Sequence, residues 1–172
     1  MRQMNIDEKL RIIDSLFYDG RFDTYFSRGL GQWVSLPRIR ELWAEMAADI
    51  ARGAAPDFCM LYAHTPFCVS RCSYCIYDSS VVAGQRDLGA HLMRMSRECA
   101  ALGPVLAPVK FACMLIGGGT PSLHTDRNFE LMLRMITETF DIMKGGIRSV
   151  EMTPVTTTGR TTAIMARYGV NR

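Results

Sequence analysis

The N-terminal third of the chain carries apolar residues at helical spacing. Between positions 5 and 18 they share one helix face with a capping-box pair at its start: Asn5 with Glu8, then Ile6, Leu10, Ile13 and Phe17. After a turn-rich stretch, a second predicted helix begins near Pro37 and ends before Gly53. Its apolar face consists of Ile39, Leu42, Trp43, Met46 and Ile50. The pattern predicts a small helical segment over residues 1–57.

From residue 58 onward, short continuous apolar runs alternate with helical patterns. The runs predict three strands, at 58–63, 109–116 and 147–152. Helical patterns follow these runs at 87–102, from a cap at Thr125 or Asp126 past Phe140, and near 161–168. Glycines and a proline mark the expected ends of the three helices, which are Gly103-Pro104, Lys144-Gly145-Gly146 and Gly169 in that order.

A strand followed by a helix, three times over, is the order of a parallel α/β sheet with right-handed crossovers. Continuous apolar runs are typical of buried parallel strands, so helices are expected on both faces of the sheet. The third strand is expected to be an open edge, whose unpaired backbone groups can pair with another chain. For the isolated chain, this predicts marginal stability with aggregation or dimerisation.

Three cysteines follow the first predicted strand. The run 61–75 places Cys68, Cys72 and Cys75 in a Cys-x3-Cys-x2-Cys array. Thiolates this close together on one loop can wrap a soft metal centre. A 4Fe–4S cluster is normally held by four cysteine thiolates, so three ligands would leave one iron open.

Two other interpretations of these cysteines stay open, a structural zinc site and reduced buried thiols. Zinc usually takes a fourth ligand from a second Cys-x2-Cys or a His pair, and none follows, because His64 and His91 are lone histidines. A disulfide framework is disfavoured, since no secretory segment opens the chain. The other cysteines lie on apolar faces and are expected to be buried thiols: Cys59, Cys99 and Cys113.

The array, with an aromatic residue before its last cysteine, resembles the signature of radical S-adenosylmethionine (SAM) enzymes. The residues ahead of it, Leu61-Tyr62-Ala63-His64-Thr65-Pro66-Phe67-Cys68, resemble the branch around oxygen-independent coproporphyrinogen III oxidase. That branch includes heme chaperones and anaerobic heme-degrading methyltransferases. Two further stretches match it in order: Gly-Gly-Gly-Thr-Pro-Ser at 117–122, then Val-Glu-Met-Thr-Pro at 150–154 with Gly-Val-Asn-Arg at 169–172.

The resemblance implies a partial (β/α)6 barrel, with residues 58–172 as its incomplete N-terminal half after the helical segment. It implies that the three array cysteines bind a 4Fe–4S cluster and that SAM binds the open iron. An electron from a reductant protein such as flavodoxin or ferredoxin would then cleave SAM to a 5′-deoxyadenosyl radical. The positions that match SAM contacts of the family are Tyr62, Tyr74, Gly118, Gly119, Thr120 and Glu151, and His64 matches a histidine near the cluster.

Without the resemblance, these residues have simpler interpretations. Three glycines after a strand form a tight turn or let the backbone approach a ligand, and no Gly-Lys-Ser/Thr follows them as in a Walker loop. Glu151 is either a solvated carboxylate or an acceptor for two ribose hydroxyls. On its chemistry alone Tyr74 is as readily a packed ring as a ligand contact, and a lone histidine such as His64 is usually structural. Each motif nevertheless lies at the C-terminal end of a predicted strand, where parallel α/β folds build their sites.

The chain departs from the branch in two respects. Coproporphyrinogen oxidases carry a fourth cysteine two residues after the third, and Ile76-Tyr77 occupies that place here. This departure favours a chaperone-like or methyltransferase-like relative and disfavours a second SAM. The chain also stops where a fourth strand is expected, so we expect a truncated chain or fragment that turns over no substrate by itself. When complete, it is expected to act on a tetrapyrrole or another large organic substrate. The alternatives are a non-catalytic iron–sulfur or heme carrier and a structural zinc module.

The amino-acid composition indicates which kinds of partner and location to expect. Hydrophobic residues make up 48% and charged residues 22% of the 172 positions, as in an ordinary globular protein. The formal charge of +3, without a run of like charges, disfavours nucleic acid. Apolar runs too short for a membrane span make the cytoplasm the expected location. The 12 methionines stand mostly among apolar neighbours and are expected to fill the core.

Overall fold

The structure is a computed structural model, and it describes residues 35–55, 58–77, 79–81 and 84–172. The helix predicted at 5–18 lies outside these residues. The chain divides into two compact units, residues 1–39 and 40–172, and every described strand belongs to the second unit. The domain boundary predicted between residues 57 and 58 stays a prediction.

The predicted second helix is confirmed as α3 (Leu36–Ala51). Two reverse hydrogen bonds close its end, from the Gly53 amide to the Ile50 carbonyl (3.0 Å) and from the Ala54 amide to the Asp49 carbonyl (2.8 Å). This bonding pattern requires a left-handed residue after the helix, and Gly53 has φ 69°. Gly53 therefore ends the helix, as its position in the sequence predicted.

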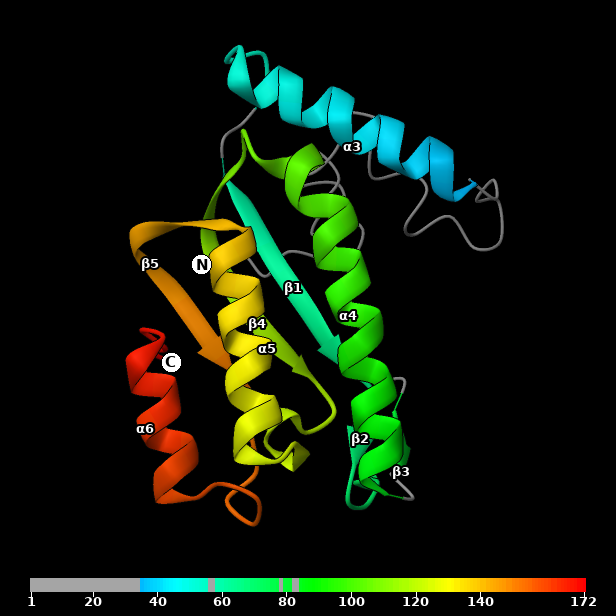
Figure 1. Cartoon of the computed structure of the whole chain (residues 1–172), viewed down its shortest axis with the longest axis vertical. Coiled ribbons are helices and arrows are strands. Elements are labelled where there is room, and N and C mark those ends of the chain that lie inside the picture. Colours follow the sequence, from blue (N-terminus) through cyan, green and yellow to red (C-terminus); the bar gives the residue numbers. More distant parts are fainter. Residues whose placement is uncertain (1–34, 56–57, 78, 82–83) are drawn as a thin grey trace, which may run out of the picture. The chain divides into compact units, whose positions relative to one another are not determined.

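Three parallel strands form the main sheet in the order β1-β4-β5 (Figure 1). They are β1 (Cys59–Thr65), β4 (Lys110–Gly118) and β5 (Asp141–Val150). Thr65 at the end of β1 is opposite Gly118, and Val150 at the end of β5 is opposite Ile116. The predicted parallel α/β sheet is confirmed, and the C-terminal ends of all three strands lie along one edge.

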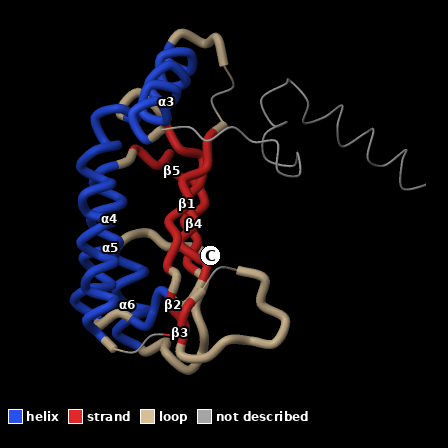
Figure 2. Tube along the Cα trace, turned by 90° about the vertical axis from the view of Figure 1, so that its right-hand side faces the viewer, coloured by secondary structure: helices blue, strands red, loops and turns tan. Residues whose placement is uncertain are grey.

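The three helices that connect and follow these strands lie on the same face of the sheet (Figure 2). They are α4 (Gln85–Leu106), α5 (Asp126–Thr139) and α6 (Gly159–Arg167). The expectation of helices on both faces is therefore wrong. The side chains of Met60 and Tyr62 on β1 are 57% and 44% exposed, because they point to the face without helices. One-sided cover of this kind is the arrangement of a (β/α) barrel.

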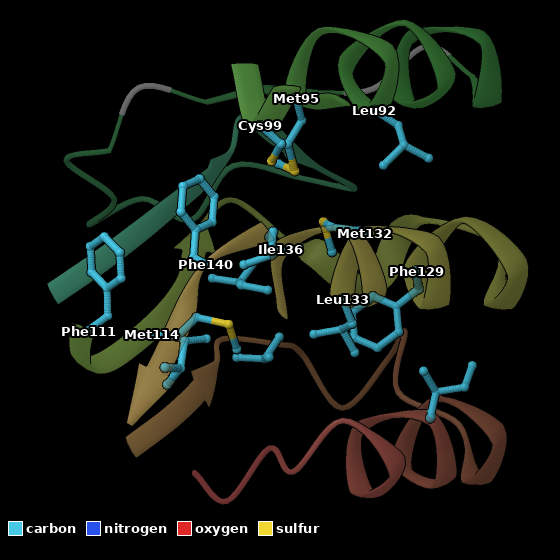
Figure 3. Close-up of a cluster of buried hydrophobic side chains, with 14 of the residues drawn as sticks. Leu92, Met95, Cys99, Phe111, Met114, Phe129, Met132, Leu133, Ile136 and Phe140 are labelled. Carbon is cyan, nitrogen blue, oxygen red and sulfur yellow. The ribbon is translucent and has the colours of Figure 1, made fainter. Parts of the chain in front are cut away.

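The core lies between the sheet and α4 and α5 (Figure 3). Phe129, Met132 and Leu133 of α5 are fully buried, together with Met114 and Ile116 of β4. The apolar spacing along α5 places its large side chains on the face that meets the sheet. Buried methionines also confirm that part of the methionine content fills the core.

The predicted end of α4 at Gly103-Pro104 is wrong, since the helix continues to Leu106 with Pro104 inside it. Proline has no N–H to donate to the carbonyl one turn earlier in the helix. Because Pro104 lies in the last turn, this costs the helix few hydrogen bonds. Gly103 has a packing role instead. A Cβ on it would lie 2.8 Å from Cγ2 of Thr139 on α5.

The predicted end of α5 at 144–146 is also wrong. The helix ends at Thr139, and the Phe140 amide caps it by donating to the Ile136 carbonyl (3.1 Å). Gly145 and Gly146 lie inside β5, where the register with β4 shifts between the pairs Phe111–Ile142 and Cys113–Ile147. Gly145 has φ 79°, so these glycines form an irregular bulge in the strand and do not stop the helix.

Two short features border this sheet. β2 (Phe67–Cys68) and β3 (Ser80–Val81) pair in parallel and were not predicted. At the outer edge of β5, the Asn171 amide donates to the Arg148 carbonyl (2.9 Å) and the Val150 amide donates to the Arg172 carbonyl (3.1 Å). The chain's last residues thus run along β5 where a fourth strand was expected to begin. No helix among the described residues has the length and apolar content to cross a membrane.

Candidate functional site

The C-terminal edge of the sheet gathers most of the predicted site residues. His64 is next to the last residue of β1, and it is opposite Gly117 of β4. Glu151 directly follows β5, and its amide donates to the Ile116 carbonyl (2.9 Å). Segments far apart in the sequence therefore meet here because the three strands are parallel and in register.

Each glycine after β4 is required by a different neighbour. A Cβ on Gly117 would meet the carboxylate of Glu151, with 2.9 Å to its Cδ. Gly118 has φ 101°, and the imidazole of His64 occupies the space where a Cβ would be. A Cβ on Gly119 would lie 2.7 Å from the Thr65 carbonyl oxygen. The interpretation of the glycines as a simple tight turn is therefore incomplete, since all three permit close approach.

Tyr62, His64 and Glu151 form the polar part of the edge. The Tyr62 hydroxyl and Nδ1 of His64 share a hydrogen bond of 3.0 Å. The Gly118 amide donates to Oε2 of Glu151 over 3.4 Å. The pKa of Tyr62 is raised by burial first, and then by the carboxylate of Glu151 and the hydroxyl of Tyr77. A carboxylate accepts several hydrogen bonds, so Glu151 retains acceptor capacity for a ligand's hydroxyls.

The segment after β4 holds the start of the cysteine loop. The Gly119 amide donates to the Thr65 carbonyl and the Thr120 amide donates to the Phe67 carbonyl, both at 2.6 Å. The hydroxyl of Thr120 donates to Sγ of Cys68 over 3.8 Å. Cys68 is therefore fixed within β2, and its thiol contacts a side chain of the glycine-rich segment.

The other two cysteines lie further out on the loop. Cys72 is exposed and Cys75 is half-buried, and the Cys75 amide donates to the Cys72 carbonyl (3.1 Å). Within the described part of the chain, no three Cys, His, Asp or Glu side chains are close enough to hold one metal ion. The structure thus does not bring the three thiols together.

The donor set nevertheless fits an iron–sulfur cluster by its chemistry. All six cysteines are free thiols, and Cys68, Cys72 and Cys75 lie on one loop. Metal sites often form together with the loop that binds the metal, because the ligands gather only around the ion. Tyr74 lies on this loop, is 84% exposed, and has its pKa raised by a hydrogen bond to Cys72. A loop fixed at Cys68 and open beyond it is suited to closing around a metal centre.

Sequence reasoning missed a pair of buried histidines under this loop. His91 on α4 and His124 after the short 3-10 helix (Pro121–Leu123) have ring centroids 6.2 Å apart. Nε2 of His91 lies 3.0 Å from the carbonyl oxygen of His64. All three histidines of the chain therefore lie in one region. No spacing rule signals this cluster, because its members come from three separate elements.

The chain combines a parallel sheet with a cysteine loop after its first strand and a glycine-rich segment after its second. No protein-family model matches the chain. Among curated proteins, the oxygen-independent coproporphyrinogen III oxidase of Bradyrhizobium diazoefficiens is 26% identical over 76% of this chain and 28% of its own length. The mitochondrial radical S-adenosyl methionine domain-containing protein 1 of Mus musculus is 26% identical over 83% of this chain and 33% of its own length. The heme chaperone HemW of Buchnera aphidicola is 27% identical over 65% of this chain and 30% of its own length.

A solved structure from the same branch has a related fold. Coproporphyrinogen III oxidase (HemN) from Escherichia coli, a radical SAM enzyme, aligns with a TM-score of 0.63 and 23% identity. The alignment covers 74% of this chain and 30% of that one. The chain is thus similar to the coproporphyrinogen III oxidase-like branch of radical SAM proteins, and it spans about a third or less of the length of these relatives.

Proposed function

We propose that this chain carries the cluster-binding and SAM-binding site of a radical SAM enzyme. The observation that supports the proposal most strongly is the contact between its motifs. Thr120 bonds both to the Phe67 carbonyl and to the thiol of Cys68, while Gly118 bonds to Glu151. Motifs that come together in this way, at the edge where parallel sheets bind ligands, favour one shared site.

In this proposal Cys68, Cys72 and Cys75 hold a 4Fe–4S cluster as thiolates. When bound, the reduced cluster and SAM supply reductive cleavage of the sulfonium carbon–sulfur bond to a 5′-deoxyadenosyl radical. The backbone of the glycine-rich segment approaches SAM, since glycine has no side chain to keep a ligand away from the backbone. The segment's members in this role are Gly118, Gly119 and Thr120.

The remaining site residues orient SAM. The carboxylate of Glu151 accepts hydrogen bonds from the ribose hydroxyls. Tyr62 and Tyr74 provide aromatic surface beside SAM, and His64 holds the hydroxyl of Tyr62 through its bond of 3.0 Å. A flavodoxin or ferredoxin supplies the electron. The substrate of the complete protein is a tetrapyrrole or a similarly large organic molecule, on the strength of the relatives' names.

A second candidate is a heme or iron–sulfur carrier without oxidase activity, or a radical SAM methyltransferase. Ile76 and Tyr77 occupy the place of the oxidases' fourth cysteine, and Ile76 is 93% exposed. A heme chaperone is among the relatives. These observations favour a relative other than the decarboxylating oxidases, and they leave the proposed cluster site unchanged.

Anaerobic reconstitution with iron and sulfide tests the cluster site. We expect about four irons and four sulfides per chain, following from the cluster type. Replacement of Cys68, Cys72 or Cys75 by alanine should abolish this uptake. Replacement of Cys59 or Cys113 by alanine is the matched control and should preserve it. Stoichiometric zinc without iron uptake would refute the proposal in favour of a structural zinc module.

Electron paramagnetic resonance separates the enzyme from the carrier. SAM added to the reduced, reconstituted protein should change the spectrum of the cluster, because it binds at the open iron. An unchanged spectrum, with the cluster present, would reject the enzyme and leave the carrier.

A further inference from the structure

His91 makes a hydrogen bond whose direction can be assigned. Nε2 of His91 lies 3.0 Å from the carbonyl oxygen of His64. A carbonyl oxygen only accepts, so Nε2 carries the hydrogen. Burial lowers the pKa of His91, and its side chain is only 8% exposed, so the neutral ring prevails at pH 7. His91 is therefore fixed in the tautomer with hydrogen on Nε2 and none on Nδ1.

This bond completes a pattern at the start of the cysteine loop. Four consecutive carbonyls, at residues 64–67, each accept a hydrogen bond from another segment. Three of the donors are backbone amides, those of Gly119, Ser80 and Thr120. The fourth is the His91 side chain. Among these four bonds, only the one from His91 depends on the identity of a side chain.

The His91 ring is also held by packing. Phe67, the residue before Cys68, meets it edge-on, with ring centroids 5.8 Å apart and the planes at 88°. The ring of His124, which is 5% exposed, lies beside it with the centroids 6.2 Å apart. Nδ1 of His91 and both ring nitrogens of His124 make no hydrogen bond within the described part of the chain. The polar contact that His91 makes is therefore directed entirely at the His64 carbonyl.

We propose that His91 is a positioning residue that fixes the start of the cysteine loop, and so Cys68, through the carbonyl of His64. The inference rests on the proposed function only for what Cys68 binds. The bond spans 27 residues and joins the first turns of α4 to the end of β1. It holds the residues before Cys68 against the helix.

Two amide substitutions separate a positioning role from simple packing. In His91→Gln the side-chain nitrogen lies near the place of Nε2 and can still donate to the carbonyl. In His91→Asn the nitrogen lies near the place of Nδ1, one bond too short to reach it. Both variants lose the imidazole ring and its contact with Phe67, so packing changes in both. The two variants differ in this hydrogen bond and otherwise only in one methylene and in helix propensity, which the amides of α4 report separately.

Amide hydrogen exchange in the metal-free chain is the primary test. In His91→Asn the amides of Ser80, Gly119 and Thr120 should exchange about tenfold faster than in His91→Gln, as expected for one lost hydrogen bond. The amides of Tyr168 and Val170 at the end of α6 should differ little between the two variants. Equal exchange at the three loop amides in both variants would overturn the inference. So would acceleration in His91→Asn that is as large in α6 as in the loop, because it would indicate general destabilisation.

Iron loading distinguishes this inference from the proposed function. If the wild-type chain takes up a cluster, His91→Asn should lose it to a chelator faster than His91→Gln. If the wild-type chain takes up no iron, the proposed function fails, while the exchange comparison still decides the role of His91.

Discussion

The imidazole of His64 lies over Gly118 at the place where a side chain would begin. The two residues belong to neighbouring strands, β1 and β4, whose ends are opposite one another. Gly118 also has φ 101°, a conformation that is strained for any residue with a Cβ. The contact therefore holds the histidine, and Tyr62 bonded to it, against the glycine-rich segment.

Replacing Gly118 by alanine should destabilise the chain. The added Cβ displaces the His64 ring and adopts an unfavourable φ, which together cost about 1–3 kcal/mol. Urea unfolding followed by circular dichroism measures this loss. The control is Gly89→Ala in α4, where nothing lies within 4 Å of the added Cβ, so that variant should gain about 0.5–1 kcal/mol. Equal urea midpoints for the two variants would contradict the role given to the His64 contact.

At the contact between α4 and α5, one substitution should have opposite effects on stability in two sequence backgrounds. A Cβ on Gly103 would lie 2.8 Å from Cγ2 of Thr139, so Gly103→Ala should destabilise the wild-type chain by about 1 kcal/mol. Thr139→Ser removes that methyl group but keeps a hydroxyl that can donate to the Met135 carbonyl as Thr139 does (2.6 Å). In the Thr139→Ser background, Gly103→Ala should therefore stabilise the helix. A double-mutant cycle by urea unfolding measures the difference. An effect of the same sign and size in both backgrounds would show that the methyl group is not the obstacle.

The electrostatics at the strand ends can be tested without a cofactor. Burial and then the Glu151 carboxylate raise the pKa of Tyr62, so Glu151→Gln should lower that pKa toward its ordinary value. Titration of carbon-13-labelled tyrosine by NMR reports it. The control is Glu130→Gln, because Glu130 contacts Tyr168 and Arg167 instead. A Tyr62 midpoint that shifts equally in both variants would contradict the assignment to Glu151.

How far sequence reasoning succeeds depends on how local each determinant is. Gly53 and Gly169 were predicted as helix ends, and both have φ 69°, because the left-handed residue after a helix is a local requirement. Gly145 has a positive φ too, but it serves a bulge within β5. The choice between a stop and a bulge depends on pairing with β4, which no local pattern contains.

The sequence pattern also did not predict that one face of the sheet has no helices. The apolar run at 58–63 is typical of a strand buried on both faces, yet Met60 and Tyr62 are exposed. Composition cannot show on which side the helices lie, since that follows from the handedness of successive connections. The resemblance to a barrel family, in which the helices lie outside, contained the information that the hydrophobic pattern lacked.

In the candidate site too, some features could be predicted from the sequence and others could not. Spacing alone predicted a metal role for the three cysteines, which stays a prediction. Strand order predicted that Gly118 and Glu151 lie at one edge, as they do. The structure does not bring the three thiols together, so the cluster site stays a prediction. The contact of His91 with the His64 carbonyl links residues 27 positions apart on different elements, and only the tertiary structure reveals it.

The buried His124 should make the chain sensitive to mild acid. Burial, and then the neighbouring His91, lower the pKa of His124 from 6.5 to about 4. The unfolded chain binds this proton near pH 6.5, whereas the folded chain resists it until about pH 4. The contribution of the neutral His124 ring to the free energy of unfolding is thus fully present above pH 6.5. As the pH falls toward 4, the free energy of unfolding decreases by an amount on the order of 3 kcal/mol. The lowered pKa of His91 acts in the same direction.

Replacing His124 by leucine should flatten this dependence. The variant removes two buried nitrogens without hydrogen-bond partners among the described residues, so its free energy of unfolding at pH 7 should be equal to or higher than that of the wild type. Between pH 6.5 and pH 4 its advantage should grow, since leucine binds no proton. Urea unfolding at several pH values measures both free energies. Met165→Leu, which removes no titratable group, is the control and should follow the wild-type dependence. Parallel curves for the wild type and His124→Leu would show that His124 is protonated as readily in the folded chain as in the unfolded one.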